Sequence, residues 1–311
     1  MPAPRASRPR LVVLAGPTGA GKTGLAVEAA ERFGGQIVGA DSMQVYRRLD
    51  IGTAKPTAGE RARAPHHLLD LIEPDEPFDV AAYLGLARPL IAELSQREAR
   101  LLVVGGTGFY LRSLLRGLFV GPGSDPALRE RLWEKARTLG LETLHAELAR
   151  VDPVAAGRIH VNDLVRTVRA LEVFELTGRP ISHFQAEHGL AEAPYEVLFI
   201  ALDLPRRELL ARIEARTRQM YEAGLIEEVR GLIEDGFSPD LRPLQAIGYK
   251  QAVAFLEGRL SRAEAVAETV RQTARYAKRQ HTWLRSQPQV EWHGPHPAGP
   301  LLEAMARFWR A

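Results

Sequence analysis

Short apolar runs without alternation mark the first third of the chain. They are LVVLA at 11–15, QIVGAD at 36–41 and LLVVGG at 101–106. Near-continuous Val, Leu and Ile is typical of strands that are buried on both faces of a parallel sheet, with helices between them. The segment LAVEAAERF predicts a helix that begins at Gly21 and ends near Gly34. The chain is therefore expected to open with a βαβ unit.

The middle of the chain has a helical pattern. Asp125 followed by Pro126 is typical of a helix N-cap with proline at the first helical position. The runs ALRERLWEKARTLG, LETLHAELARV and NDLVRTVRALEVFELTG then predict successive helices. A strand-like run, YEVLFIALDLP at 195–205, follows, and we expect it to rejoin the sheet. From Arg206 onward we expect helices. Their breaks are expected at Gly236, Pro239, Pro243 and Gly248.

The segment GPTGAGKT, residues 16–23, has the features of a phosphate-binding loop. It follows a predicted strand and precedes a predicted helix, which is the context that such a loop requires. Glycines let backbone N–H groups face an anion, Lys22 adds a positive charge, and Thr23 can hold Mg²⁺. Because the loop recognises phosphoryl oxygens, it does not by itself choose a nucleotide.

These patterns predict an α/β fold. We expect a P-loop NTPase-like parallel sheet flanked by helices, with an all-helical insertion domain. The expected division is 1–124 for the first part of the core, 125–193 for a helical insertion that acts as a mobile cap, and 194–311 for the rest of the core and the C-terminal helices.

Composition narrows the class of protein. The chain of 311 residues is 45% hydrophobic and 25% charged, as in soluble globular proteins. It has no run of about 18 apolar residues, so no membrane span is expected, and its first apolar run is too short for a signal peptide. We therefore expect a cytoplasmic protein. The absence of cysteine excludes disulfides, thiolate nucleophiles and Cys-based zinc sites.

Two polar positions follow the second and third predicted strands. Asp41 ends the second run, and Thr107 lies in GGTGFY after the third. Since the carboxyl ends of strands in such a sheet face the ligand crevice, we expect both beside the phosphate loop. There Asp41 is a metal ligand, a general base or only a turn cap. For Thr107, a functional role and a merely structural turn remain equal alternatives.

No convincing Walker B aspartate follows a later apolar strand, because LLVVGG ends in glycine and FIALD lies far down the chain, which weakens the case for an ordinary ATPase.

A basic segment lies near the C-terminus. The run RQTARYAKRQHTWLR, residues 271–285, contains no acidic residue. On a helix, its residues Arg271, Arg275, Lys278 and Arg279 share one face, with Tyr276 and Trp283 beside it. With a net charge of only +3, attraction to nucleic acid depends on where such residues lie. The face is either a phosphate-binding surface or simply a solvated helix face.

Several stretches together resemble one family, the tRNA dimethylallyltransferases, also called tRNA isopentenyltransferases. The matching pieces are GPTGAGKT, ADSMQVYRRLDIGTAKP, PHHLLD, VVGGTGFYLRSLL, DPALRERL, NDLVRTVRALEV, RIEARTRQMYEAGLIEEV, QAIGYKQ and RYAKRQHTWLR. They occur in the family's order from Leu11 to Arg285. The resemblance implies transfer of a dimethylallyl group from dimethylallyl diphosphate to N6 of adenosine 37 in the anticodon loop of tRNA, with release of diphosphate. It also implies Mg²⁺ as cofactor, and we expect a monomer.

The resemblance also implies roles for particular residues. Asp41 is the implied base, Thr107 lies at the reacting centre, and Thr23 holds the metal. The residues that bind the diphosphate are Gly16, Pro17, Thr18, Gly19, Ala20, Gly21, Lys22, Thr23 and Arg216. The residues expected to contact tRNA are Asp41, Ser42, Met43, Gln44, Thr107, Arg129, Asn162, Arg166, Arg275, Lys278 and Arg279.

Two pairs of residues depart from the family's pattern. Gly19 and Ala20 stand where many members have Ala-Ser, a change that a backbone cradle tolerates. Asn162 and Asp163 stand where many members have Gln-Arg, which puts the tRNA contacts of that helix in doubt.

Two other functions use the same features. An ATP-dependent kinase of a small metabolite or nucleoside would use the phosphate loop, with Asp41 as base for a hydroxyl and the helical insertion as a lid. A switch-like RNA-binding NTPase would bind tRNA without modifying it and would not need Asp41. The basic C-terminal segment argues against the metabolite kinase, which has no use for it.

Overall fold

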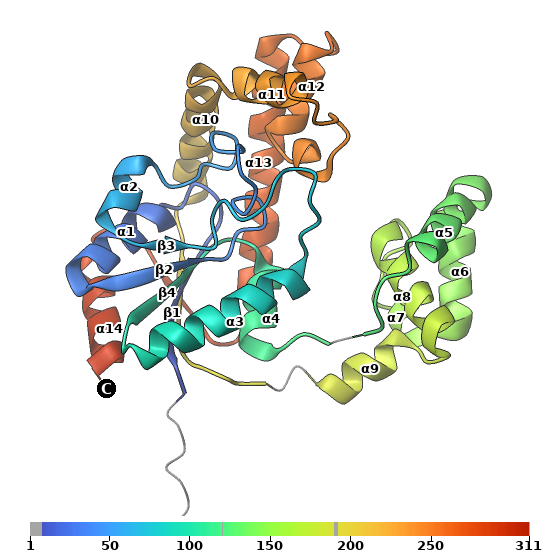
Figure 1. The fold of residues 1–311 in the computed structure, drawn as a ribbon, viewed down its shortest axis with the longest axis horizontal. Helices are drawn as coiled ribbons and strands as arrows, with labels where there is room; N and C mark the ends of the chain where they lie inside the picture. Colours follow the sequence, from blue (N-terminus) through green and yellow to red (C-terminus); the bar gives the residue numbers. More distant parts are fainter. Residues whose placement is uncertain (1–7, 120, 190–191, 311) are drawn as a thin grey trace, which may run out of the picture. The chain divides into compact units, whose positions relative to one another are not determined.

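The chain folds as two compact units. The computed structural model describes residues 8–119, 121–189 and 192–310. One unit runs to Leu115 and resumes at Pro194, and the other is Arg116–Ala193 (Figure 1). None of the described helices is long and apolar enough to cross a membrane.

A parallel sheet forms the centre of the first unit. Within the described residues its six strands have the order β3-β2-β4-β1-β5-β6. All neighbouring strands pair in parallel. The strands are β1 (Arg10–Ala15), β2 (Gly35–Gly39), β3 (His66–His67), β4 (Arg100–Val104), β5 (Glu196–Leu202) and β6 (Val290–His293). The predicted parallel sheet flanked by helices is confirmed, including the return of the run at 195–205 as β5.

Burial explains why β1 is central. Its residues Leu11 to Ala15 are 0% exposed, as expected for a strand with helices on both faces. Helix α1 (Lys22–Phe33) follows and ends at Gly34, whose φ of 65° is the left-handed C-cap that the sequence predicted. Burying each large aliphatic side chain contributes about 1.5–3 kcal/mol, so this layer carries much of the stability.

The other helices of this unit cover both faces of the sheet and extend beyond it (Figure 1). They are α2 (Ala58–Arg63), α3 (Val80–Gln96), α4 (Gly108–Arg116), α10 (Arg206–Glu222), α11 (Leu225–Glu234), the 3₁₀ helix η1 (Arg242–Gln245), α12 (Tyr249–Leu256), α13 (Arg262–Arg285) and α14 (Gly299–Arg310). The long helix α13 begins at a capping box in which Ser261 and Glu264 bond each other's backbone N–H groups.

Two details of the sequence prediction were wrong. The chain beyond Arg206 is not all helical, because Val290–His293 forms β6 and adds to the sheet beside β5. Its sequence VEWH is short and mixed in polarity, so it gives no strand signal. The second strand also ends at Gly39, which leaves Asp41 in the loop that follows.

The second unit is all helical and has its own core. Its helices are α5 (Pro126–Leu139), α6 (Leu141–Val151), α7 (Pro153–Ala156), α8 (Leu164–Thr177) and α9 (Ile181–His188). Asp125 caps α5 by accepting from the Leu128 N–H at 3.0 Å. Phe119, which precedes the first helix of this unit, stacks on Phe184, with ring centroids 5.2 Å apart.

Candidate active site

The phosphate loop joins β1 to α1 at the carboxyl edge of the sheet. Gly16, Gly19 and Gly21 have φ values of 150°, 86° and 92°, a region that favours glycine. At Gly16 a Cβ atom would also lie 3.0 Å from the carbonyl oxygen of Leu202 in β5. The backbone of the loop therefore requires glycine here, as the sequence predicted.

Lys22 is held within its own loop. Its Nζ donates to the carbonyl oxygens of Gly16 at 2.9 Å and Pro17 at 3.0 Å. Burial and the nearby Arg216 guanidinium lower the pKa of Lys22 to about 8, while the Asp41 carboxylate opposes that shift. Lys22 is consequently a cation at neutral pH in a place that already holds another cation, which is an arrangement suited to an anionic ligand.

Arg216 reaches this loop from α10. Its Nη1 donates to the Thr18 hydroxyl at 3.3 Å. Burial lowers the pKa of Arg216, and the Asp41 carboxylate opposes the shift. The fold thus brings Arg216 to residues 16–23 across a separation of 198 positions in the sequence.

Gln280 of α13 anchors the phosphate loop, a role that was not predicted from the sequence. Its Oε1 accepts the Thr18 N–H at 2.9 Å, and its Nε2 donates to the Gly106 carbonyl at 2.9 Å. A Cβ atom at Gly106 would lie 2.2 Å from that Nε2. One amide therefore joins the loop after β1 to the loop after β4. No local pattern marks this glutamine, which lies within a basic run.

Asp41, Ser42 and Thr107 lie together next to the phosphate loop. The Thr107 hydroxyl accepts the Ser42 N–H at 3.0 Å, and Asp41 Oδ1 accepts the Met43 N–H at 2.9 Å. Asp41 therefore caps a turn. Its carboxylate also acts on Lys22 and Arg216.

Tyr276 of α13 completes the surroundings of Asp41. Burial and the Asp41 carboxylate raise the pKa of Tyr276 to about 12. The Arg279 guanidinium lies 5.6 Å from the centre of its ring. Tyr276 is thus a neutral phenol beside the carboxylate, placed there by the basic helix.

Gln44 lies at the end of the DSMQ run. Its Nε2 donates to the carbonyl oxygens of Thr53 at 3.1 Å and Ala54 at 3.2 Å. Both amide hydrogens are therefore used within the protein, which leaves the side-chain oxygen as the group open to a ligand.

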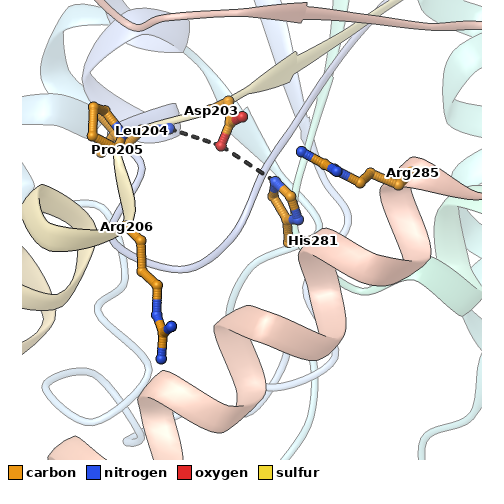
Figure 2. Close-up of a pocket in the computed structure, with 6 residues that line it drawn as sticks. All are labelled: Asp203, Leu204, Pro205, Arg206, His281 and Arg285. Atoms are coloured by element: carbon orange, nitrogen blue, oxygen red, sulfur yellow. Dashed lines mark hydrogen bonds and ion pairs between the residues drawn. The ribbon is translucent and has the colours of Figure 1, made fainter.

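A hollow of about 500 Å³ lies between the end of β5 and α13 (Figure 2). It is lined by Asp203, Leu204, Pro205, Arg206, His281 and Arg285. Asp203 follows β5, and its Oδ1 lies 3.4 Å from His281 Nε2. This aspartate of FIALD is far from the loop in sequence but adjacent to it in the fold, since β5 pairs with β1. Two arginines give the hollow a positive rim.

Basic residues of α13 line a second hollow of about 580 Å³. Arg275, Lys278 and Arg279 are exposed there. Arg271, which the sequence grouped with them, is instead paired with Glu268. Trp283 packs against the start of α4, because a Cβ atom at Gly108 would lie 2.5 Å from its ring.

The expected tRNA contacts of the helical unit differ in their surroundings. Arg129 is paired with Glu172, with Nε and Oε1 2.8 Å apart, and Arg169 bonds the same carboxylate at 2.6 Å. Although burial opposes it, these two guanidiniums hold the pKa of Glu172 below its usual range. Asn162 and Arg166 are exposed, and the Arg166 side chain is 73% accessible.

Family models match most of the chain. One described as IPP transferase covers residues 44–287, and one described as isopentenyl transferase covers residues 9–67. A tRNA dimethylallyltransferase 1 of Trichlorobacter lovleyi is 50% identical over 97% of this chain and 99% of its own. The chain belongs to the tRNA dimethylallyltransferase family. The resemblance seen in the sequence is thereby confirmed.

Further tRNA dimethylallyltransferases agree in sequence and fold. The one from Syntrophobacter fumaroxidans is 51% identical over 96% of this chain and 87% of its own. A solved tRNA isopentenylpyrophosphate transferase from Bacillus halodurans has a TM-score of 0.73 and 37% identity, covering 97% of each chain. A solved eukaryotic dimethylallyltransferase acting on tRNA has a TM-score of 0.80 and 26% identity, covering 93% of this chain and 75% of its own.

Prenyl transferases of this family typically use a divalent metal. Among the described residues no group of three or more His, Asp or Glu side chains is arranged to hold one. Thr23, at the start of α1, is half-buried and carries a hydroxyl, an oxygen of the kind that hard cations bind. Such a site fits Mg²⁺, which keeps several waters and binds mainly through substrate phosphates.

Proposed function

We propose that this member of the family transfers a dimethylallyl group from dimethylallyl diphosphate to N6 of adenosine 37 in tRNA and releases diphosphate. The observation that carries this proposal is the meeting of a cationic phosphate loop with an adjacent carboxylate, Asp41. The transferase names of relatives that match nearly the whole chain support the reaction class. The protein acts as a monomer.

The donor binds at residues 16–23 and Arg216. The C1–O bond of the allylic diphosphate breaks with its electron pair moving to the leaving diphosphate. Lys22, Arg216 and the backbone N–H groups of the loop stabilise the charge that develops there, which is commonly the largest contribution to catalysis. Thr23 would hold Mg²⁺, which would supply neutralising charge for the phosphates when bound.

The acceptor amine meets the donor at Asp41. N6 of adenine is a weak nucleophile because its lone pair is delocalised, so the bond from N6 to C1 forms as the carbon becomes cationic. Asp41 accepts the N6 proton. Thr107 acts at the same centre, and its hydroxyl fixes the backbone of Ser42. An anticodon-loop base is a sensible target because it is extruded at a cost of about a few kcal/mol.

The basic face of α13 binds the tRNA backbone. Arg275, Lys278 and Arg279 are exposed on this face, so their charges are open to phosphates. Asn162 and Arg166 of the helical unit make further contacts as part of a cap. Arg129 and Arg169 differ from these residues, because each forms an ion pair with the buried carboxylate of Glu172.

The reaction itself tests the proposal. Purified protein, Mg²⁺, dimethylallyl diphosphate and unmodified tRNA with adenosine 37 should yield adenosine that carries one five-carbon unit, detected by nucleoside mass analysis. The matched control is the same tRNA with guanosine 37, which should stay unmodified. Consumption of ATP with a small acceptor while adenosine 37 is untouched would contradict the transferase and favour a kinase.

A further inference from the structure

Backbone strain gathers in one segment next to the DSMQ run. Among the described residues, five non-glycine residues have a positive φ, and four of them lie between 48 and 70. They are Arg48 at 66°, Ala54 at 48°, Leu68 at 63° and Asp70 at 53°. Each such residue costs about 1–3 kcal/mol and persists only where its surroundings hold it, and such strain clusters at functional sites.

Glu228 of α11 holds the loop 49–55 by its backbone. Its Oε2 accepts the N–H groups of Asp50 at 3.1 Å and Ile51 at 2.8 Å, and its Oε1 lies 3.5 Å from the Gly52 nitrogen. The Tyr249 hydroxyl donates to Oε1 at 2.6 Å. A Cβ atom at Gly52 would lie 2.4 Å from the Tyr249 ring. One carboxylate thus holds the backbone of residues 50–52 in place.

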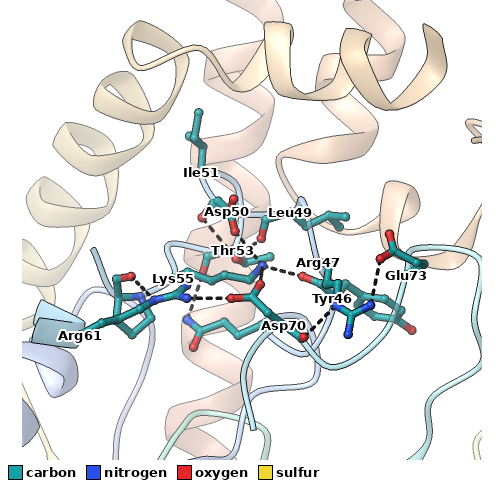
Figure 3. A network of polar contacts seen from close by, with 12 residues as sticks. Tyr46, Arg47, Leu49, Asp50, Ile51, Thr53, Lys55, Arg61, Asp70 and Glu73 are labelled. Atoms are coloured by element: carbon teal, nitrogen blue, oxygen red, sulfur yellow. Dashed lines mark hydrogen bonds and ion pairs between the residues drawn. The ribbon is translucent and has the colours of Figure 1, made fainter. Parts of the chain in front are cut away.

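Lys55 fixes the other end of the loop (Figure 3). Its side chain is 2% exposed, and Nζ lies 2.7 Å from Asp50 Oδ1 and 2.5 Å from Asp70 Oδ1. Nζ also donates to the Tyr46 carbonyl at 2.5 Å. Arg61 bonds the second oxygen of Asp70 at 2.7 Å. A buried ammonium with three partners ties the loop to both sides of the strained segment.

The fixed loop presents two carbonyls to Gln44. Thr53 and Ala54 accept both hydrogens of its amide. Of the two ends of the Gln44 amide, only the nitrogen can face two carbonyl oxygens favourably, so the orientation of the side chain is set. Gln44 then offers an incoming base only a hydrogen-bond acceptor, its side-chain oxygen. Adenine carries a donor at N6, whereas a base with a keto oxygen at that position has none.

We propose that Glu228 and Lys55 are positioning residues for base selection. By fixing the loop 49–55, they hold the amide of Gln44 so that it accepts a hydrogen bond from an exocyclic amine and repels a keto oxygen. The inference rests on the proposed function, because the selected base is the target adenosine of tRNA. A polar site of this kind discriminates through the unpaired group that the wrong base leaves behind.

The test compares binding of two tRNAs that differ at one base. Inosine replaces the amine of adenosine by a keto oxygen, so tRNA with inosine 37 is the probe against tRNA with adenosine 37. The parent should bind the adenosine form about tenfold more tightly. Glu228→Gln should move this ratio toward one. The matched control is Glu227→Gln on the same helix, whose carboxylate is 66% exposed and should leave the ratio unchanged.

A double-mutant cycle separates positioning from general destabilisation. In a Gln44→Ala background, Glu228→Gln should change the ratio no further, because both substitutions remove one interaction. Hydrogen exchange of the backbone amides of residues 50–52 should be faster in Glu228→Gln than in the parent. An unchanged exchange rate would overturn the inference. So would an equal loss of affinity for both tRNAs. If Glu228→Gln does not fold, Tyr249→Phe removes only one donor to the carboxylate and should give a smaller shift.

The measured ratio of tRNA affinities does not depend on the dimethylallyl transfer reaction. Absence of prenylated product in the parent would overturn the proposed function, whereas the ratio of affinities and the hydrogen exchange are measured without any reaction. A parent that forms product but binds both tRNAs equally would retain its function and overturn the role given to Glu228 and Lys55.

Discussion

The two halves of the candidate active site are built differently. The donor half is a continuous loop, residues 16–23, whose lysine bonds the carbonyls of its own backbone. The acceptor half joins Ser42 to Thr107 across 65 positions, and Ile51 to Glu228 across 177. A phosphate needs many donors at close spacing, which one loop supplies. A base needs a few groups in fixed orientation, and these come from distant elements.

Asp41→Asn should break the acceptor half alone and have the largest effect. The asparagine oxygen still accepts the Met43 N–H, so the turn persists. Loss of the proton acceptor should lower single-turnover transfer about 10²–10⁴-fold. The dissociation constant of dimethylallyl diphosphate, measured by calorimetry, should change little. A large loss of donor affinity with unaltered transfer would contradict the division between the halves.

Lys22→Met should break the donor half. A hydrogen bond to a charged group is worth about 1.5–3 kcal/mol, so donor affinity should fall roughly 10–100-fold. Affinity for tRNA should stay unchanged, because Lys22 lies in the phosphate loop. Arg218→Met on α10 is the control, since Arg218 is 61% exposed and paired with Glu214. Equal loss of tRNA binding would mean that the halves are not separate.

Donor affinity should also depend on pH through Lys22. Its pKa is about 8 in the fold against an ordinary 10.5. Above about pH 8 the free protein loses this charge, so donor affinity should decline by up to about tenfold per pH unit, and binding near pH 8 should take up protons. Calorimetry in buffers of different ionisation enthalpy measures that uptake. Lys22→Met should abolish it.

The lowered pKa of Lys22 has the opposite effect on the stability of the ligand-free protein, which should increase with pH. Because the pKa is lower in the folded than in the unfolded chain, the unfolded chain binds more protons between about pH 8 and 10.5. The contribution of Lys22 to the free energy of unfolding should therefore rise across that window. Parallel melting of the parent and Lys22→Met detects the difference.

A local motif marks the phosphate loop in the sequence, whereas the contacts that join this loop to other elements have no local signal. Gly16, Gly21 and Lys22 form a local motif in which spacing implies geometry. Gln280 has no such signal, because its two bonds join loops that only the finished sheet brings together. The expected parallel strands and the helices of the second unit are confirmed, because their periodicity is local. The strand β6 was missed, since pairing with β5 and not its own pattern makes it a strand.

The smallest effects concern two groups of basic residues that the sequence treats alike, one on α13 and one in the helical unit. Charge-neutral replacement of Arg275, Lys278 and Arg279 should lower the salt dependence of tRNA binding by about 0.7–0.9 per residue, because each exposed cation releases a counterion. Arg129→Gln should leave that slope unchanged. It should instead destabilise the helical unit by about 1–3 kcal/mol, because Glu172, 0% exposed, loses one of two guanidinium partners. Filter binding at several salt concentrations and thermal melting separate the two. A lower slope in Arg129→Gln would show that Arg129 also contacts phosphate, and that pairing inside the protein is no guide to which arginines bind tRNA.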